Sequence, residues 1–245
     1  MGTLTDRVVV ITGARRGLGR DFARYFAEDG ANVVLADLKD ADAATQAASG
    51  TGARCLNVQT DITDRTSVEA LMRRTKEEFG RLDILVNNAA LWREPEAYGL
   101  LDCPAEVWDA TWAVNLTGVL NCYQAAAPLM QERGWGRIIN VSSTASGLGS
   151  NSYGLSKNAL ELMTTGMARE VGKFGITVNS IVPGICAFEG ARGQLPQFDE
   201  ILARIPLGRV GSSRDLYAAM AYLASEAAAY VTGENMVLDG GLSTR

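Results

Sequence analysis

The chain alternates short apolar runs, rich in β-branched residues, with amphipathic stretches, and this alternation limits its possible folds more than any other feature. The runs show no regular exchange of apolar and polar residues, which is typical of strands covered on both faces. Seven of them predict strands: residues 7–12, 32–36, 53–59, 82–86, 136–141, 176–182 and 235–239. The stretches between them predict helices: residues 17–29, 40–49, 64–79, 105–132, 153–174, 195–204 and 213–224. Strands that alternate with helices are typical of an α/β protein.

Length and composition fit a single globular domain. The 245 residues contain no internal repeat and no linker-like segment, so residues 1–245 are expected to fold as one domain. No apolar run approaches the roughly 18 residues of a membrane span, and the first residues do not resemble a signal peptide, so a cytoplasmic protein is expected. The formal net charge of −5, without a basic stripe, argues against a nucleic-acid partner.

The chain contains no histidine, and this absence removes several kinds of catalytic site. A Ser-His-Asp triad, a Cys-His pair and most zinc sites all need an imidazole. The four cysteines, Cys55, Cys103, Cys122 and Cys186, are scattered and are expected to be free thiols. We therefore expect no metal site, and acid–base chemistry near neutral pH has to come from a Tyr, Lys, Cys or carboxylate with a shifted pKa.

A glycine-rich turn follows the first predicted strand directly. Gly13, Gly17 and Gly19 join that strand to the helix expected over residues 17–29, and the second strand ends at Asp37. Glycines let the backbone approach a pyrophosphate, which binds at the positive N-terminus of the helix. The spacing Gly-x-x-x-Gly-x-Gly differs from the usual Gly-x-Gly-x-x-Gly, but the flanking strands and the acidic residue indicate a dinucleotide site.

Asp37 and Arg16 give opposite indications about which dinucleotide is bound. A carboxylate at the end of the second strand accepts hydrogen bonds from the adenosine ribose hydroxyls and repels a 2′-phosphate, which favours NAD. Arg16, beside the glycine turn, can instead bind that phosphate or point into solvent. Because Asp37 occupies the more direct position, the sequence predicts NAD rather than NADP.

Tyr153 and Lys157 lie four residues apart at the start of a predicted helix, so they share one face of it. A cation about 4 Å from a phenol stabilises the phenolate by roughly 4 kcal/mol at an effective dielectric constant of about 20. Before desolvation is subtracted, this lowers the tyrosine pKa by up to roughly three units from about 10. Such a tyrosine can give a proton to a carbonyl oxygen or take one from an alcohol. Ser143, at the end of the preceding strand, can hold the same oxygen, with Ser142 as the alternative.

Several of these residues also have a purely structural interpretation. Asn115 lies in an apolar helical stretch, where it is either a site residue or a core amide whose hydrogen bonds are satisfied. Asp61, after the third strand, either contacts the adenine amino group or caps the helix over residues 64–79. The spacing of Tyr153 and Lys157 also occurs in ordinary surface pairs, so its interpretation depends on the other motifs.

Two irregular segments follow predicted strands and are expected to form the substrate site. Residues 91–104 are interpreted as a pocket wall, and residues 185–206 as a segment that covers the substrate. Bulky apolar residues in these segments and in the loop after Ser143 indicate a partly apolar pocket for a small or medium substrate: Trp92, Tyr98, Leu148, Phe188 and Phe198. Each of them can equally be ordinary loop packing.

A series of short motifs stands in order along nearly the whole chain: Thr12-Gly13-x-x-x-Gly17-x-Gly19, Asp61 before Ile62-Thr63, Asn87-Asn88-Ala89, Asn115, Ser143, Tyr153-x-x-x-Lys157, Pro183-Gly184 and Asp239-Gly240-Gly241. Together they resemble the short-chain dehydrogenase/reductase family. The resemblance implies a Rossmann-type fold, in which helices cover both faces of a doubly wound sheet of seven parallel strands. It also implies a small-molecule substrate and a homotetramer.

The resemblance assigns catalytic roles to four residues. Tyr153 would be the acid or base, and Lys157 would lower its pKa and hold the nicotinamide ribose. Ser143 would orient the substrate oxygen, and Asn115 would position a water in a proton relay. Besides Tyr153 and Lys157, the resemblance implies a larger set of cofactor contacts: Gly13, Arg16, Gly17, Leu18, Gly19, Asp37, Leu38, Asp61, Ile62, Asn87, Ala89, Pro183, Gly184 and Ile185.

The sequence departs from the family pattern at three places. Ala90 replaces the usual glycine after Asn-Asn-Ala, so the backbone beside the cofactor would be tighter. The loop between Ser143 and Tyr153 is shorter than usual, which leaves the choice between the two serines open. Phe188 stands where a threonine commonly helps to hold the carboxamide, and the backbone of Ile185 would take part of that role.

These observations lead to an NAD(H)-dependent oxidoreductase that interconverts a secondary alcohol and a ketone, with hydride chemistry supplied by the nicotinamide. An NADPH-dependent 3-oxoacyl thioester reductase is the second hypothesis. It would favour a basic docking face, and the acidic charge balance disfavours it. A dinucleotide sensor without turnover is the third hypothesis, against which the complete set of Ser143, Tyr153, Lys157 and Asn115 argues.

Overall fold

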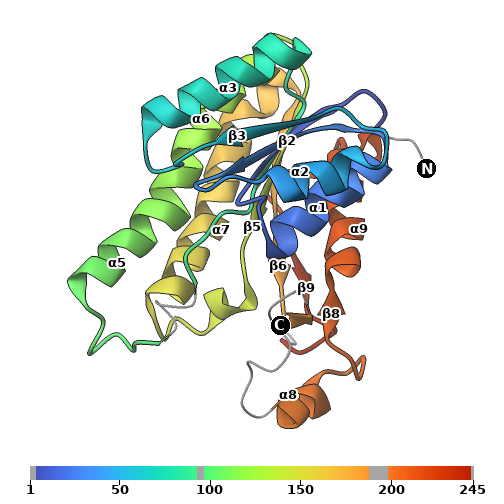
Figure 1. The fold of residues 1–245 in the computed structure, drawn as a ribbon. Coiled ribbons are helices and arrows are strands. Elements are labelled where there is room, and N and C mark those ends of the chain that lie inside the picture. The colour runs from blue at the N-terminus through green and yellow to red at the C-terminus, as the bar shows by residue number, and fades with distance from the viewer. Residues whose placement is uncertain (1–3, 93–96, 188–197, 244–245) are drawn as a thin grey trace.

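The computed structural model describes residues 4–92, 97–187 and 198–243, and its centre is a seven-stranded sheet (Figure 1). The strands lie in the order β3-β2-β1-β4-β5-β6-β9, and every neighbouring pair is parallel. Their bounds are Val8–Thr12 for β1, Asn32–Asp37 for β2, Cys55–Gln59 for β3, Ile84–Asn87 for β4, Gly136–Val141 for β5, Ile176–Pro183 for β6 and Asn235–Leu238 for β9. The order runs in opposite directions from β1 and from β4, so the predicted doubly wound fold is confirmed.

Helices cover both faces of this sheet (Figure 1). In β1, Val9 and Ile11 pack into one apolar cluster and Val8 and Val10 into another, all four at most 1% exposed. This two-sided burial explains why the run over residues 7–12 shows no polar alternation. The first cluster contains side chains of α1 (Gly17–Glu28), α2 (Asp42–Ser49) and α9 (Ser213–Ala224). The second contains side chains of α3 (Arg65–Phe79), α6 (Gly118–Gln131) and α7 (Ser152–Val171).

Parallel pairing places all strand ends of one kind at the same side of the sheet. Five strands end there at predicted site residues or directly before them: Thr12, Asp37, Asn87, Val141 and Pro183. We call this side the carboxyl edge and the opposite side the amino edge. The strand order reverses between β1 and β4, which are paired with each other. Ligands of open α/β sheets bind outside the carboxyl edge at such a point.

Side chains cap the helices that carry or flank the predicted site. Asn151 Oδ1 accepts a hydrogen bond from the Gly154 N–H at 2.8 Å and is the N-cap of α7. The cap of α3 is Asp64, which accepts from the Thr66 N–H at 3.0 Å. The interpretation of Asp61 as this cap is therefore wrong, because a carboxylate caps only from the position directly before the first turn.

The helical region predicted over residues 105–132 consists of three consecutive parts. It begins as α5 (Ala105–Trp112), continues as a π-helical turn (Ala113–Thr117) and ends as α6. The apolar periodicity predicts helix here but does not distinguish the π turn. Such turns are frequent at functional sites, and this one contains Asn115.

Several short elements were not predicted. They are the 3-10 turns Thr144–Gly147, Gly172–Phe174 and Glu226–Ala228, and the parallel pair β7 (Cys186–Ala187) and β8 (Gly211–Ser212). The helix α8 (Phe198–Arg204) lies within the range predicted for a short helix. Residues 188–197 of the proposed covering segment, Phe188 included, and the side chain of Phe198 lie outside the described residues.

Two further features concern the whole described chain. The four cysteines are free thiols, as predicted. Among the residues that the structure describes, no helix combines the length and the apolar character needed to cross a bilayer.

Candidate active site

The turn between β1 and α1 has a conformation that requires glycine. Gly13 and Gly17 have φ values of +65° and +58°, in the left-handed region that disfavours side chains. A Cβ atom on Gly19 would lie 2.6 Å from Asn88 Nδ2. Arg16, the N-cap of α1, makes no side-chain hydrogen bond to the first helical turn. The close backbone and the uncapped helix N-terminus therefore fit a pyrophosphate.

Asn88 connects this glycine turn to the end of β4. Its Nδ2 atom donates to the carbonyls of Thr12 and Gly13 at 2.9 and 3.1 Å, and its backbone N–H donates to Thr12 Oγ1 at 3.0 Å. The side chain of Asn87, in contrast, donates to Asn140 Oδ1 at 2.9 Å and is buried within the sheet. Asn88 was not predicted as a site residue, although its position directly after a strand end was a usable signal.

Asp37 is held in a fixed orientation at the end of β2. Its two carboxylate oxygens accept hydrogen bonds from the backbone N–H groups of Arg15 and Lys39, each at 3.1 Å. The Nε atom of Arg15 lies 3.7 Å from Asp37 Oδ1, whereas Arg16 is exposed. Arg15, which was not predicted, is therefore the arginine that partly offsets the Asp37 charge. Leu38 follows with a side chain 59% exposed.

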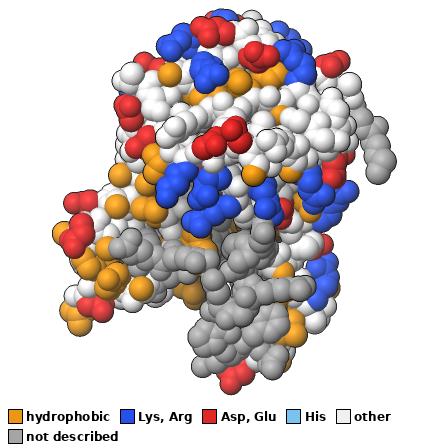
Figure 2. All heavy atoms as spheres, viewed as in Figure 1, with side chains coloured by type: hydrophobic (Ala, Val, Ile, Leu, Met, Phe, Trp, Pro, Cys, Tyr) orange, Lys and Arg blue, Asp and Glu red, His pale blue; other side chains and the backbone are white. Residues whose placement is uncertain are grey.

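Positive side chains gather around this part of the molecule. Figure 2 shows Lys and Arg side chains side by side across the middle of the face that carries α1 and α2, below a group of acidic side chains. A chain with a net charge of −5 thus has a locally basic region. Such a region attracts the phosphates of a dinucleotide.

Tyr153 and Lys157 lie together in the first turns of α7, as their spacing predicts. Tyr153 is 9% exposed and Lys157 is 2% exposed, and Lys157 Nζ lies 5.7 Å from the centre of the Tyr153 ring. The same Nζ atom donates to the Val141 carbonyl at 2.7 Å. Burial lowers the pKa of Lys157 from its ordinary value of 10.5 to about 8, so the lysine remains mostly protonated at pH 7. A positive charge is thus held next to a phenol in a dry environment.

The two serines after β5 have different surroundings. Ser142 is 3% exposed, and its hydroxyl donates to Glu161 Oε1 at 2.8 Å and to the Lys157 carbonyl at 3.3 Å. Ser143 Oγ accepts from the Ala145 N–H at 3.2 Å, an interaction that does not use its proton. Ser143 can therefore still donate to a substrate oxygen, whereas Ser142 is engaged within the protein.

The 3-10 turn that begins after Ser143 packs against the start of α7. A Cβ atom on Gly154 would lie 2.6 Å from the Ala145 carbonyl oxygen, so only glycine allows this approach. Asn158 Nδ2 donates to the Ser146 carbonyl at 3.4 Å. These contacts bring Ser143 and Tyr153 to the same corner of the carboxyl edge.

Asn115 joins the loop after β4 to α7. Its side chain is fully buried, accepts from the Leu91 N–H at 2.8 Å and donates to the Leu91 carbonyl at 2.9 Å. It also donates to Ser156 Oγ at 3.0 Å, and Ser156 donates in turn to the Tyr153 carbonyl at 2.7 Å. Asn115 is thus a satisfied buried amide, as one of its two interpretations predicts, and its role in the site stays a prediction.

Comparison with known proteins assigns this arrangement to a family. A family model described as enoyl-(acyl carrier protein) reductase matches residues 13–243. The cis-4-hydroxycyclohexanecarboxylate dehydrogenase of Sinomonas cyclohexanicum is 39% identical over 96% of both chains. The NAD-dependent glycerol dehydrogenase of Listeria innocua is 36% identical over 99% of this chain and 96% of its own. A short-chain type dehydrogenase/reductase from Mycobacterium marinum superposes with a TM-score of 0.91 at 32% identity, covering 99% of this chain and 97% of that one.

The chain belongs to the short-chain dehydrogenase/reductase family. It is therefore an oxidoreductase that binds a nicotinamide dinucleotide and acts on small molecules. The resemblance predicted from its motifs is confirmed.

The other predicted cofactor residues of this short-chain dehydrogenase/reductase also lie at or near the carboxyl edge. Asp61 Oδ1 accepts from the Thr63 N–H at 2.9 Å, and Ile62 packs against Gly118 of α6. Pro183, Gly184 and Ile185 follow one another at the end of β6. Gly184 donates to the Leu238 carbonyl at 3.0 Å, and the Ile185 carbonyl accepts from Gly211 at 2.9 Å.

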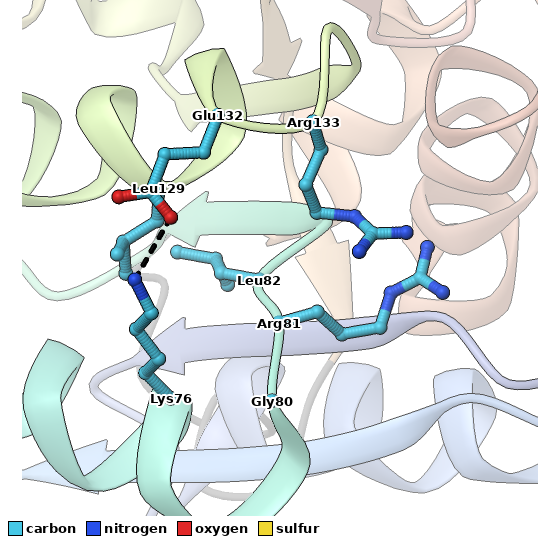
Figure 3. Close-up of a pocket in the computed structure, with 7 residues that line it drawn as sticks. All are labelled: Lys76, Gly80, Arg81, Leu82, Leu129, Glu132 and Arg133. Carbon is cyan, nitrogen blue, oxygen red and sulfur yellow. Dashed lines mark hydrogen bonds and ion pairs between the residues drawn. The ribbon is translucent and has the colours of Figure 1, made fainter.

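One hollow in the surface of the protein lies away from the predicted site. It has a volume of about 210 Å³ and lies at the amino edge, between the ends of α3 and α6 (Figure 3). Leu82 and Leu129 line it, and Lys76 and Glu132 are joined by an ion pair of 2.8 Å. The chemistry of the side chains, rather than the shape of the surface, therefore identifies the candidate site.

The predicted pocket walls are described only in part. Trp92 and Tyr98 are half-buried beside the gap in the described residues, and Leu148 is 77% exposed. The side chains of Phe188 and Phe198 lie outside the described residues.

Proposed function

We propose that this short-chain dehydrogenase/reductase interconverts a secondary alcohol and a ketone with NAD(H), and that Tyr153 transfers the proton. The observation that carries the proposal is the buried Lys157 ammonium beside the buried Tyr153 ring, at the same corner as Ser143. A charge in a dry environment stabilises a phenolate more strongly than the same charge in water. With a pKa of about 8, Lys157 carries that charge at neutral pH.

The proposed chemistry divides between cofactor and protein. The bound nicotinamide would supply or accept the hydride. Tyr153 donates its phenolic proton to the ketone oxygen as the alcohol forms, and accepts the proton of the alcohol in the reverse direction. Ser143 donates a hydrogen bond to the same oxygen and thereby orients the substrate. Lys157 stabilises the Tyr153 phenolate, and Asn115 would hold the water of the relay through its backbone carbonyl, since its side chain is engaged.

The same proposal assigns the cofactor contacts. Gly13, Gly17 and Gly19 leave room for the pyrophosphate at the N-terminus of α1. Asp37, fixed by two backbone N–H groups, would accept hydrogen bonds from the ribose hydroxyls and disfavour a 2′-phosphate. The NAD dependence named for the glycerol dehydrogenase relative supports this choice. Arg15 acts in the opposite direction, so the preference for NAD is expected to be moderate.

The substitution Tyr153→Phe tests the proposal directly. Removing the hydroxyl removes the proton donor, and we expect kcat to fall by about 10³-fold or more while the dissociation constant for NADH stays close to that of the wild type. Stopped-flow or steady-state absorbance with a panel of cyclic and aromatic secondary alcohols measures the first quantity, and fluorescence titration the second. Tyr123→Phe, which removes another largely buried phenol, serves as the control. Turnover retained in Tyr153→Phe would refute the assignment.

The substitution Asp37→Ala tests the cofactor choice. Without the carboxylate, Arg15 and Lys39 are free to bind a 2′-phosphate, and we expect the ratio of kcat/KM for NAD to that for NADP to fall by about 10-fold or more. Kinetics with both cofactors at saturating alcohol measure this ratio. An unchanged ratio would show that Asp37 does not discriminate between them.

A 3-oxoacyl thioester reductase that uses NADPH is the second candidate function. The description of the matching family model, enoyl-(acyl carrier protein) reductase, favours acyl thioesters. Turnover of acetoacetyl thioesters with NADPH that exceeds turnover of free alcohols with NAD would support it. Tight NAD binding without turnover of any alcohol, ketone or thioester would instead support a dinucleotide sensor.

Further expectations belong to the same proposal. Residues 1–245 are expected to form one domain, with residues 185–206 covering the substrate. A homotetramer and a cytoplasmic location remain predictions, which size-exclusion chromatography with light scattering and fractionation of cells would test.

A further inference from the structure

Three successive residues at the end of β5 each form a polar contact with α7. The contacts join Asn140 Nδ2 to Thr164 Oγ1 at 2.8 Å, Lys157 Nζ to the Val141 carbonyl at 2.7 Å, and Ser142 Oγ to Glu161 Oε1 at 2.8 Å. Residues 157, 161 and 164 are spaced so that they lie along one face of the helix. Tyr153 precedes Lys157 on the same face. Polar contacts thus join the helix that bears the phenol to the strand that leads to Ser143.

The contact between Ser142 and Glu161 has no part in the proposed chemistry so far. Both residues are buried, at 3% and 8% exposed. A buried carboxylate is costly, and an apolar pair of similar size would fill the same space at lower cost. A hydrogen bond to a carboxylate, however, is shorter and more directional than an apolar contact. The contact therefore serves to fix the position of the end of β5 relative to α7, rather than to stabilise the fold.

We propose that the hydrogen bond between Ser142 and Glu161 sets the position of Ser143 relative to Tyr153. Ser143 is covalently joined to Ser142, and Glu161 lies two helical turns after Tyr153 on the same helix. The bond therefore joins the strand end that leads to Ser143 to the helix that bears Tyr153 through two buried side chains. Glu161 and Ser142 are positioning residues, and this role rests on the proposed function of Ser143 and Tyr153.

Removal of the carboxylate gives Ser142 a different partner. Its hydroxyl also donates to the Lys157 carbonyl at 3.3 Å, and without Glu161 it would turn towards that oxygen. The 3-10 turn after β5 would move with it, because Ser143 is the N-cap of this turn, which packs on α7. A displacement of about 1 Å at a reacting group is enough to lower turnover by up to about 100-fold.

Four variants of the full-length protein test this inference. Glu161→Gln keeps an acceptor oxygen, whereas Glu161→Met keeps the size and removes it. Ser142→Ala, and the double variant that combines it with Glu161→Met, complete a double-mutant cycle. Glu170→Met is the control. Glu170 is exposed on the second half of the same helix, far from Tyr153, and accepts a hydrogen bond from the Tyr123 hydroxyl at 2.7 Å.

We expect turnover to fall in the variants that lack the hydrogen bond between residues 142 and 161, and to be retained where residue 161 keeps an acceptor oxygen. In Glu161→Met and Ser142→Ala we expect kcat to fall by about 10- to 100-fold, with the dissociation constant for NADH unchanged. Glu161→Gln should restore kcat, Glu170→Met should leave it unchanged, and the double variant should be no worse than Ser142→Ala. Hydrogen exchange of the peptide over residues 142–148 should become faster in Glu161→Met only, among the three glutamate variants.

Each part of the inference can fail separately from the proposed function. Wild-type kcat and exchange in Glu161→Met would overturn the positioning role, even if Tyr153→Phe is inactive. A fall in kcat in Glu170→Met equal to that in Glu161→Met would also overturn it, since any loss of a helix contact would then suffice. Faster hydrogen exchange over residues 142–148 in Glu161→Met, together with a fully active Tyr153→Phe, would instead support the positioning role of the bond between Ser142 and Glu161 and refute the proposed function.

Discussion

The two edges of the sheet each bury a cation but surround it differently. At the amino edge, Arg137 is 2% exposed, and its guanidinium lies 3.6 Å from the Glu226 carboxylate and 4.3 Å from the centre of the Trp135 ring. It also donates to the Gly136 carbonyl at 2.9 Å. At the carboxyl edge, Lys157 is equally buried, but its ammonium donates to one carbonyl and forms no ion pair among the described residues.

This difference shows where the molecule accepts a cost in stability. Burial lowers the pKa of both cations, but the Glu226 carboxylate opposes this shift at Arg137, whereas burial alone acts on Lys157. An unpaired buried charge destabilises a fold, and such charges are retained mainly at functional sites. The amino edge therefore uses its buried charge for structure, and the carboxyl edge keeps its buried charge available for Tyr153.

The substitution Lys157→Met breaks the comparison most strongly. We expect kcat to fall by about 10³-fold, because the phenolate of Tyr153 loses its counter-charge. The free energy of unfolding at pH 7 should instead rise by about 1 to 3 kcal/mol, because the burial cost implied by the lowered pKa disappears. Steady-state kinetics and urea unfolding measure the two effects. A lower free energy of unfolding would mean that the bond to the Val141 carbonyl outweighs the burial cost.

The substitution Arg137→Met should have the opposite pattern. It leaves the backbone carbonyl partners of the guanidinium without their donor, whereas the exposed Glu226 carboxylate keeps its hydrogen bond from Arg7. We therefore expect the free energy of unfolding to fall by about 1 to 3 kcal/mol. The kcat of the folded variant should equal that of the wild type, because Arg137 lies at the far edge of the sheet. Urea unfolding followed by kinetics at low temperature measures both. A change in kcat without a change in stability would contradict the division between the two edges.

The pH dependence of stability sharpens the comparison by a smaller amount. Above pH 8 the folded protein loses the proton of Lys157, while the unfolded chain keeps it up to about pH 10.5. The unfolded state then binds more protons, so the free energy of unfolding rises with pH in this window. Other groups contribute equally to wild type and Lys157→Met. We therefore expect the stability advantage of the variant to shrink by about 2 kcal/mol between pH 8 and pH 10. An advantage that grows over this range would contradict the lowered pKa.

The helices and strands were largely predictable from the pattern of apolar residues. A strand that is buried on both faces is a continuous apolar run, and a helix that packs on the sheet has apolar residues at helical spacing. Residues 136–141 were predicted as a strand and form β5 with the same bounds. The run over residues 7–12 was predicted one residue too long, because Arg7 precedes the first paired residue of β1. The π turn around Asn115 was not predictable, since one extra residue in a helical turn barely changes the apolar pattern.

The candidate site was predictable in its residue types but less so in its contacts. The spacing of Tyr153 and Lys157 placed them on one helix face, and the structure brings them together. Neighbouring residues with the same chemistry were harder to separate. Arg15 rather than Arg16 lies at Asp37, and Ser142 is the serine that the interior engages. Successive side chains point in different directions, and the choice between them depends on partners from distant parts of the chain.

The sequence by itself determined the alternation of strands and helices, the glycine turn before α1 and the phenol and ammonium on one helix face. These follow from periodicity and spacing within single elements, where each residue carries its own physical preference. Only the tertiary structure decided which serine keeps a free proton, which arginine lies beside Asp37, and that Lys157 is buried without an ion pair to any residue that the structure describes. Each of these depends on groups brought from another strand or helix, because solvation and hydrogen bonding are set by neighbours in space.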